Sequence, residues 1–213
     1  MTEAEVEKFL EFVQEKKPKY YALCLTAVTT GLRIGELPGL TWSDVDFNNR
    51  MIDVNKQWKI LQNGKKGFGQ LKTKSSGQLR TKSSKRKVPL PAKTVQILAR
   101  EKQGAVLDIN NRVFPFGDSA RQSIARLFSA LGYNYSMHDL RHTYATTLVA
   151  AGVDYKTVSE LMGHGVNMTM KTYSHVNEDM RVRAAKTTEF FNKLNAFLTM
   201  GHGGGEAAKI RVF

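Results

Sequence analysis

Residues 136–152 read SMHDLRHTYATTLVAAG. Ser136 is a preferred helix N-cap and Gly152 is a preferred residue just beyond a helix end, so the stretch predicts a helix over 136–151. His138 and Arg141 stand one turn apart on this helix and therefore share one of its faces. Taken alone, such a pair is more often found on an ordinary surface than in a functional site.

Helical patterns also dominate the rest of the chain. Periodic apolar residues, with caps such as Thr2, Gly31 and Asp154, predict helices at 2–16, 18–30, 91–102, 118–131, 154–162, 167–175 and 177–198. Three strands are predicted near 51–58, 66–73 and 86–90, separated by turns rich in Gly and Ser. The sequence therefore predicts a mainly helical α+β domain with a small three-stranded antiparallel sheet.

The composition restricts the class of protein. A chain of 213 residues with 41% hydrophobic and 24% charged residues is typical of one soluble globular domain. A single cysteine, Cys24, excludes a disulfide within the chain and suits a reducing compartment. No apolar run has the length of a membrane span, and the acidic start of the chain does not resemble a signal peptide. A cytoplasmic protein is expected.

The net charge of +13 is concentrated in one segment. Residues 54–100 contain 13 Lys and Arg and no Asp or Glu, while outside this segment 19 basic residues balance 19 acidic ones. Trp58 and Phe68 interrupt the basic run, which favours a folded basic face over a flexible tail. Such a face predicts a polyanionic partner, and nucleic acid is the first candidate. The predicted DNA contacts are Lys56, Lys59, Lys65, Lys66, Arg80, Lys85, Arg86 and Lys87.

Three further side chains with chemical potential lie outside the helix at 136–151. Arg33 stands in the sequence GLRIGE at 31–36, His164 follows a glycine, and Tyr173 comes nine residues after His164. Each has a plainer interpretation: Arg33 as an ion pair with Glu36, His164 as a cation at a helix end, and Tyr173 as a core residue. Singly, these plainer interpretations are favoured.

Together and in this order, the residues resemble the catalytic set of the tyrosine recombinases, the lambda-integrase-like family of phage and mobile-element integrases. The resemblance covers about residues 1–198. It implies that Tyr173 attacks DNA to form a 3′-phosphotyrosine, and that Arg33 and Arg141 clamp the phosphate. His138 and His164 would bind the phosphate or handle the phenol proton, so that cleavage is expected to fall below about pH 6.

The family also has a catalytic lysine, which protonates the leaving 5′ oxygen and stands between the second and third strands. Here the segment GQLKTKSS at 69–76 is followed at once by GQLRTKSS at 77–84. Lys72 matches the family position in the first copy, and Arg80 takes that position in the second copy. Because a guanidinium is a poor proton donor, Lys72 is preferred, with Lys74 and Lys82 as alternatives.

The resemblance implies a catalytic domain over 1–198 and a flexible C-terminal tail over 199–213. The core-binding and arm-binding domains that precede it in the family are expected to be absent, because the chain begins at the first predicted helix of the catalytic domain. The expected partners are double-stranded DNA attachment sites and other recombinase protomers in a synaptic complex. No metal, cofactor or ATP is expected, and the expected location is the nucleoid of a bacterial or phage-infected cytoplasm.

Two other functions remain open at this point. A type IB topoisomerase-like enzyme that relaxes DNA would use the same chemistry without joining two sites. A non-catalytic DNA-binding module would keep the same side chains only as a phosphate-binding pocket.

Overall fold

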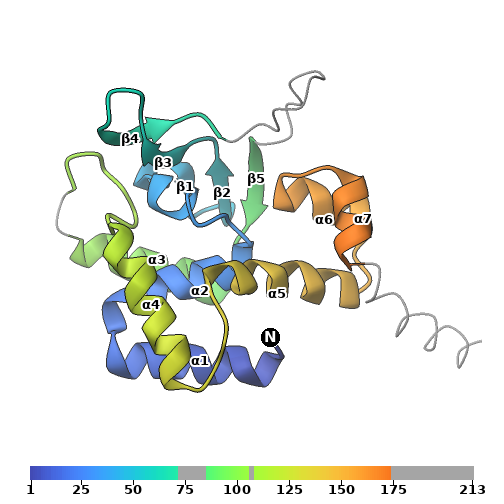
Figure 1. Cartoon of the computed structure of the whole chain (residues 1–213). Coiled ribbons are helices and arrows are strands. Elements are labelled where there is room, and N and C mark those ends of the chain that lie inside the picture. Colours follow the sequence, from blue (N-terminus) through green and yellow to red (C-terminus); the bar gives the residue numbers. More distant parts are fainter. Residues whose placement is uncertain (72–84, 106–107, 174–213) are drawn as a thin grey trace, which may run out of the picture. The chain divides into compact units, whose positions relative to one another are not determined.

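The computed structural model describes residues 1–71, 85–105 and 108–173 (Figure 1). The chain divides into two units, Met1–Tyr173 and Ser174–Phe213, and the second lies wholly outside the described residues. The predicted helix over 177–198 and the predicted tail over 199–213 therefore fall outside them as well. The predicted domain limit at residue 198 stays a prediction.

The predicted helices up to Tyr173 are present. Thr2 and Ser136 cap their helices in capping boxes, and Gly31 ends its helix with a φ of 62°. One predicted cap is shifted by a residue, because Gly117 is the N-cap and Asp118 is the first helical residue. In the described residues the α-helices are α1 (Glu3–Lys16), α2 (Tyr21–Thr30), α3 (Ala92–Gly104), α4 (Asp118–Ala130), α5 (Met137–Ala150), α6 (Tyr155–Met162) and α7 (Val166–Tyr173), and the 3-10 turns are η1 (Pro18–Tyr20), η2 (Leu37–Gly39) and η3 (Trp42–Asp44).

The strands are arranged differently from the prediction. A three-stranded antiparallel sheet has the order β1 (Val45–Asp46), β2 (Met51–Val54), β5 (Arg86–Pro89), whereas β3 (Gln57–Ile60) and β4 (Lys66–Gly69) form a separate hairpin. The single strand predicted over 51–58 is wrong. It is interrupted at Asn55 and Lys56, whose side chains both bind the carboxylate of Asp44. These bonds hold the chain away from the line of β2, so that β3 starts a new ladder.

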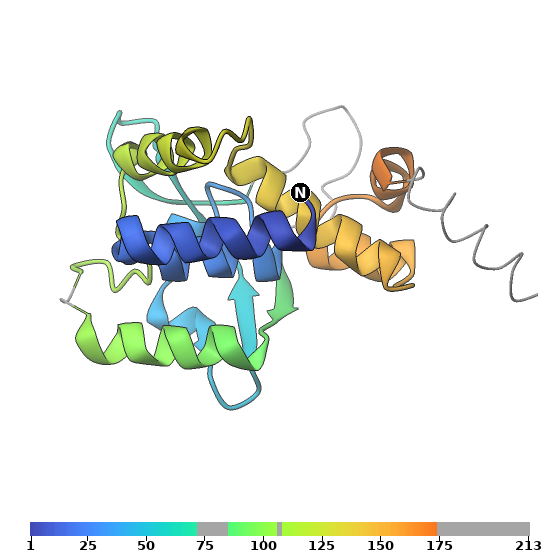
Figure 2. The same cartoon turned by 90° about the horizontal axis from the view of Figure 1, so that it is seen from below.

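The core is built around α2, which is buried on nearly all sides. Helices α1, α3 and α5 pack against it, and seen from below α1 runs between α3 and α4 (Figure 2). Phe9 of α1 and Phe128 of α4 are both fully buried and stack with their ring centroids 3.8 Å apart. At one end of this core α5 extends toward α6, which also contacts β5 (Figure 1). This end brings together α5, β5 and the segment that follows α6, each of which carries predicted site residues.

Replacing Phe128 with Ala should lower the free energy of unfolding by about 3–5 kcal/mol, because it removes a buried ring and leaves a cavity beside Phe9. Urea denaturation followed by circular dichroism measures this change. Ile109→Ala is the control, since Ile109 is 97% exposed and its loss should change stability by less than about 0.5 kcal/mol. Equal effects of the two substitutions would contradict the described core.

Candidate active site

Three arginines meet at the C-terminal end of α6, one from α5, one from β5 and one from the segment after α2. The last carbonyls of a helix lack intrahelical partners and carry partial negative charge, so they suit cationic donors. Here three successive carbonyls each accept one bond of 2.6 Å, from Arg86 Nε to Leu161 O, from Arg141 Nη2 to Met162 O and from Arg33 Nη2 to Gly163 O. We call Arg33, Arg86 and Arg141 the arginine cluster.

Gly163 is required at this helix end for two reasons. Its φ of +65° lies in the left-handed region, which favours glycine. In addition, a Cβ atom at this position would lie 2.8 Å from Nη1 of Arg86 and 3.3 Å from Nη1 of Arg33. A side chain here would therefore push against two members of the arginine cluster.

The carboxylate of Glu36 lies between two of these arginines and is only 2% exposed. It accepts bonds of 2.7 Å from both Nη1 and the backbone N of Arg33, and bonds of 2.8 and 3.2 Å from the two Nη atoms of Arg86. Burial alone would raise the pKa of Glu36, but the bonds and charges of Arg86 and Arg33 lower it to about 2. Glu36 is therefore ionised at any physiological pH.

The cluster keeps an excess of positive charge. Among the described residues here, three guanidiniums face one carboxylate, that of Glu36. Arg141 is 4% exposed, and it also donates to the carbonyl of Gly31. Burial, together with the charge of Arg33, lowers the pKa of Arg141 to about 9, so that it stays cationic at neutral pH. A buried excess of cations favours the binding of an anion such as a phosphodiester.

His164 follows directly after the carbonyls that hold the arginines. Its Nδ1 lies 3.0 Å from Oγ1 of the buried Thr169, which fixes the ring against α7. Burial, together with the charges of Arg141 and Arg33, lowers the pKa of His164 to about 4. The ring is therefore neutral at pH 6, and its protonation does not account for the expected loss of cleavage near that pH.

Tyr173, the last described residue of α7, is held by a histidine other than the two predicted ones. Its hydroxyl lies 3.0 Å from Nδ1 of His142, and the side chain is 3% exposed. His138 is exposed and contacts His142 ring to ring, with centroids 4.5 Å apart. The pKa of Tyr173 is raised by burial, an effect that the charge of Arg141 only partly opposes. This contact could not be predicted from the sequence, where the four-residue spacing of His138 and His142 indicates only that they share one helix face.

The predicted residues thus fall into three groups. Arg33, Arg141 and His164 gather around the end of α6, and His138 and Tyr173 each contact His142. The candidate lysines Lys72, Lys74 and Lys82, like the predicted DNA contact Arg80, lie outside the described residues.

The predicted DNA contacts also divide. Lys59, Lys65, Lys66, Lys85 and Lys87 are exposed. Lys56 is paired with Asp44 and is 24% exposed. Arg86 does not fit the prediction of an exposed DNA contact, because its side chain is 5% exposed and is bound to Glu36 and the end of α6.

A match to a known family decides what this chain is related to. The sequence pattern of the Phage integrase family matches residues 1–180. The chain belongs to the phage integrase family. The resemblance to tyrosine recombinases is thereby confirmed.

Several curated relatives support the assignment to the phage integrase family. The chain is 33% identical to a XerC-like tyrosine recombinase of Caldanaerobacter subterraneus subsp. tengcongensis, over 87% of this chain and 52% of that protein. It is 29% identical to the transposase of transposon Tn916 from Enterococcus faecalis, over 87% and 50%. It is 28% identical to the ICEBs1 integrase of Bacillus subtilis, over 81% and 49%. The chain spans about half the length of these relatives.

Solved structures of integrases have the same fold. The Tn1549 transposon integrase in complex with transposon right end DNA matches with a TM-score of 0.70 and 27% identity, covering 87% of this chain and 65% of that chain. The catalytic domain of bacteriophage HP1 integrase matches with a TM-score of 0.57 and 20% identity, covering 83% and 86%. The predicted α+β fold class is therefore confirmed.

Neither a metal centre nor a membrane span is found in the described part of this integrase-family chain. No three His, Cys, Asp or Glu side chains are grouped there as possible metal ligands. None of the helices there is long and apolar enough to cross a membrane.

A hollow of about 580 Å³ opens beside His164, between β5 and the α6–α7 pair. Its basic lining includes Lys156 in the first turn of α6, which the sequence analysis missed because it stands outside the basic segment. The hollow is lined by three lysines, Lys85, Lys87 and Lys156, and by one acidic residue, Glu160. Arg86 of the arginine cluster also lines this hollow, so the three lysines adjoin the cluster.

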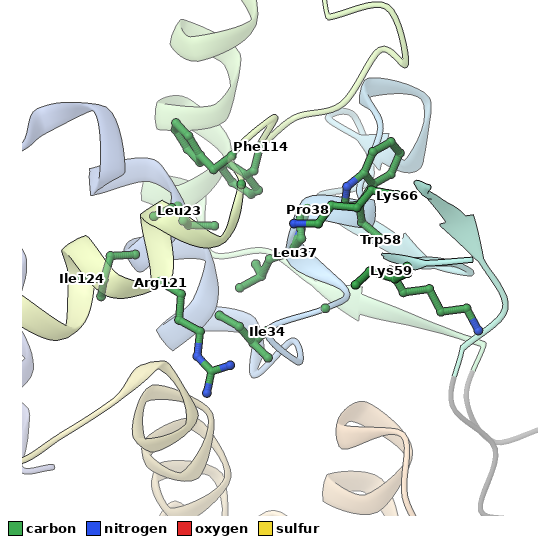
Figure 3. Close-up of a pocket in the computed structure, with 15 residues that line it drawn as sticks. Leu23, Ile34, Leu37, Pro38, Trp58, Lys59, Lys66, Phe114, Arg121 and Ile124 are labelled. Atoms are coloured by element: carbon green, nitrogen blue, oxygen red, sulfur yellow. The ribbon is translucent and has the colours of Figure 1, made fainter. Parts of the chain in front are cut away.

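A second hollow, of about 230 Å³ and mainly apolar, lies between α4, the β3–β4 hairpin and the segment after Arg33 (Figure 3). Arg121 of α4 extends along Ile34, whereas Lys59 extends away from the hollow (Figure 3). None of the predicted catalytic residues in the described part of the chain lines it. The arginine cluster, not this hollow, is therefore the candidate active site.

The lowered pKa of His164 predicts a pH-dependent stability. The unfolded chain binds a proton at His164 below about pH 6.5, whereas the folded protein binds it only below about pH 4. The free energy of unfolding should therefore fall as the pH drops through this window. His164→Gln removes this contribution, so urea denaturation at about pH 7 and about pH 4.5 should show a smaller difference for the variant than for the wild type. An equally steep fall in the variant would contradict the assignment.

Proposed function

We propose that this chain is the catalytic part of a site-specific DNA recombinase of the integrase type. It would cleave and rejoin DNA strands through a 3′-phosphotyrosine. The observation that carries this proposal is the set of arginines on the end of α6, with a histidine and a tyrosine beside it, in a chain of the phage integrase family. The relatives' names and the Tn1549 integrase–DNA complex support DNA as the substrate.

Arg33 and Arg141 would bind the non-bridging oxygens of the scissile phosphate. Arg33 is 31% exposed and can reach a phosphate at the surface, while Arg141 is 4% exposed and donates to the same helix end. A planar guanidinium suits two phosphate oxygens better than an ammonium group does. These charges are in place before the substrate arrives, so they stabilise the charge that builds up in the transition state. The reaction would then need neither a metal ion nor ATP, because the phosphotyrosine retains the energy of the phosphodiester bond.

In the cleavage step the phenol oxygen of Tyr173 attacks phosphorus, and the bond from phosphorus to the 5′ oxygen breaks. The leaving 5′ oxygen takes a proton from a lysine, for which Lys72 is preferred and Lys74 and Lys82 are the alternatives. The phenol proton passes to a neutral histidine, and Nδ1 of His142 lies within hydrogen-bond distance of it. Rejoining reverses these transfers when a 5′ hydroxyl attacks the phosphotyrosine. His138 and His164 would bind the phosphate oxygens.

Under this proposal, the described site is in the state before Tyr173 is placed for attack. The side chain of Tyr173 is 3% exposed and its hydroxyl is bonded to His142, so it must move outward before it can meet a phosphate. The full recombination reaction would require attachment sites and other protomers in a synaptic complex. Such a complex would act in the cytoplasm, where the DNA of the mobile genetic element would be found.

The proposed chemistry predicts a covalent protein–DNA complex. At low salt, a library of nicked duplexes of random sequence should give covalent product with the wild type, because the short 5′-hydroxyl fragment released by cleavage diffuses away and prevents rejoining. Tyr173→Phe should give none, since it lacks the attacking oxygen. Denaturing electrophoresis of labelled DNA measures the product.

The same experiment separates the other two functions. No covalent product with the wild type, despite DNA binding, would favour a non-catalytic DNA-binding module. Covalent product together with relaxation of plasmid, but no joining of two selected sites, would favour a topoisomerase-like enzyme.

The basic hollow beside His164 predicts a phosphate contact at Lys156. Lys156→Ala should weaken DNA binding uniformly across sequences and reduce the slope of log K against log salt by about 1, because one fewer counterion is released. Fluorescence anisotropy at several salt concentrations measures the slope. Lys8→Ala is the matched control and should leave the slope unchanged, because Lys8 is an exposed residue of α1, a helix that lies apart from α6 (Figure 1). An unchanged slope for Lys156→Ala would remove the hollow from the DNA path.

A further inference from the structure

Arg86 is a buried cation inside a strongly basic run. In β5 the side chains alternate, so that Arg86 and Val88 are buried while Lys87 is exposed, as is Lys85 just before the strand. Arg86 shares the overall charge of its neighbours but not their access to solvent, since its side chain is only 5% exposed. It therefore needs a role other than that of a surface phosphate contact.

The guanidinium of Arg86 is committed to protein groups on two other segments. Nε donates to the carbonyl of Leu161, while Nη1 and Nη2 donate to the two carboxylate oxygens of Glu36. These contacts join β5 to the end of α6 and to the segment after α2. Three elements that are far apart in the sequence are thus fixed by one side chain.

Glu36 passes this constraint on to Arg33. Its carboxylate holds both the backbone N and the Nη1 atom of Arg33, which is the more exposed of the two proposed phosphate clamps. We propose that Arg86 is a positioning residue for strand cleavage, acting through Glu36 on Arg33 and through Leu161 on the helix end that precedes His164. This inference rests on the proposed function.

The loss of Arg86 would change both position and charge. Glu36 would keep only Arg33 as a described cationic partner, so the carboxylate would draw that guanidinium toward itself. The excess positive charge available to a phosphate would fall by one unit. A displacement of about 1 Å in a group that positions the substrate can reduce a rate by about 10²-fold. An ammonium group could replace the charge but not the forked geometry of three bonds.

The test compares Arg86→Met, Arg86→Lys and a control, Arg112→Met. Arg112 is also a partly buried arginine in an ion pair, with Asp108, and is 11% exposed, but it belongs to a different part of the structure. The measurements are the cleavage rate at saturating DNA, the Kd for DNA and the melting temperature. The substrate is a nicked duplex from the random library that the wild type has been found to cleave. All rates are measured below the melting temperature of each variant.

We expect Arg86→Met to lower the saturated cleavage rate at least about tenfold, with a change in Kd of less than about threefold. Arg86→Lys should recover only part of the rate, and Arg112→Met should cleave at the wild-type rate. A merely structural role for Arg86 would lower the melting temperature without this separation of rate from Kd.

A neutral substrate tests whether the effect passes through the phosphate clamp. In a methylphosphonate, a methyl group replaces one charged non-bridging oxygen of the scissile phosphate, so less depends on the position of Arg33. The fold loss caused by Arg86→Met should therefore be smaller on this substrate than on the phosphate. Equal losses on both substrates, or a wild-type rate on the phosphate, would overturn the inference.

A variant that does not fold and a wild type that does not cleave are interpreted differently. If Arg86→Met does not fold, Arg86→Lys is judged on the same two substrates, and a wild-type rate for that variant overturns the inference. If the wild type itself gives no covalent product, the proposed function fails before Arg86 is tested.

Discussion

Three successive backbone carbonyls at the end of α6 hold the guanidiniums of the arginine cluster in place. Three cations close together repel one another, so their grouping needs compensating negative groups. The helix end supplies partial charge at Leu161, Met162 and Gly163, and the carboxylate of Glu36 supplies a full charge. This compensation is incomplete, and the remaining positive charge is what a phosphate would neutralise.

The members of the cluster differ in their access to solvent, and this gives them different tasks. Arg33 is partly exposed, whereas Arg86 and Arg141 are buried. A substrate phosphate would therefore meet Arg33 first and then approach the buried charge of Arg141. The hydroxyl of Tyr173, the proposed nucleophile, is bonded to His142 instead. In this arrangement the positive charge is already in place, whereas the proposed nucleophile is not yet free to attack.

The sequence was informative where local chemistry decides the structure. Capping residues such as Ser136 and Gly31 predicted helix ends correctly, because a cap depends on its near neighbours. The strand pattern was less reliable, since the break between β2 and β3 depends on Asp44, which lies before the sheet. The burial of Arg86 was missed because three adjacent basic residues were read as one surface, although the two-residue period of a strand separates the middle one from its neighbours.

The contacts among candidate site residues could not be read from spacing alone. The order of Arg33, Arg141, His164 and Tyr173 predicted a common site, but not that backbone carbonyls hold the arginines. Nor did it predict that His142 would hold the phenol. Carbonyl positions depend on how α6 docks on α5 and β5, and this docking is set by packing across the whole core.

The arginines donate to backbone carbonyls and not to side chains. The position of the arginine cluster therefore depends less on which side chains Leu161 and Met162 carry than on the length of α6. An apolar residue of similar size at either position would leave the carbonyl where it is. Inserting or deleting one residue between Asp154 and His164 is different, since each step along a helix advances about 1.5 Å and turns about 100°. Every carbonyl would then face the wrong guanidinium. The arginine cluster should therefore tolerate conservative substitutions in α6 but not an insertion or a deletion.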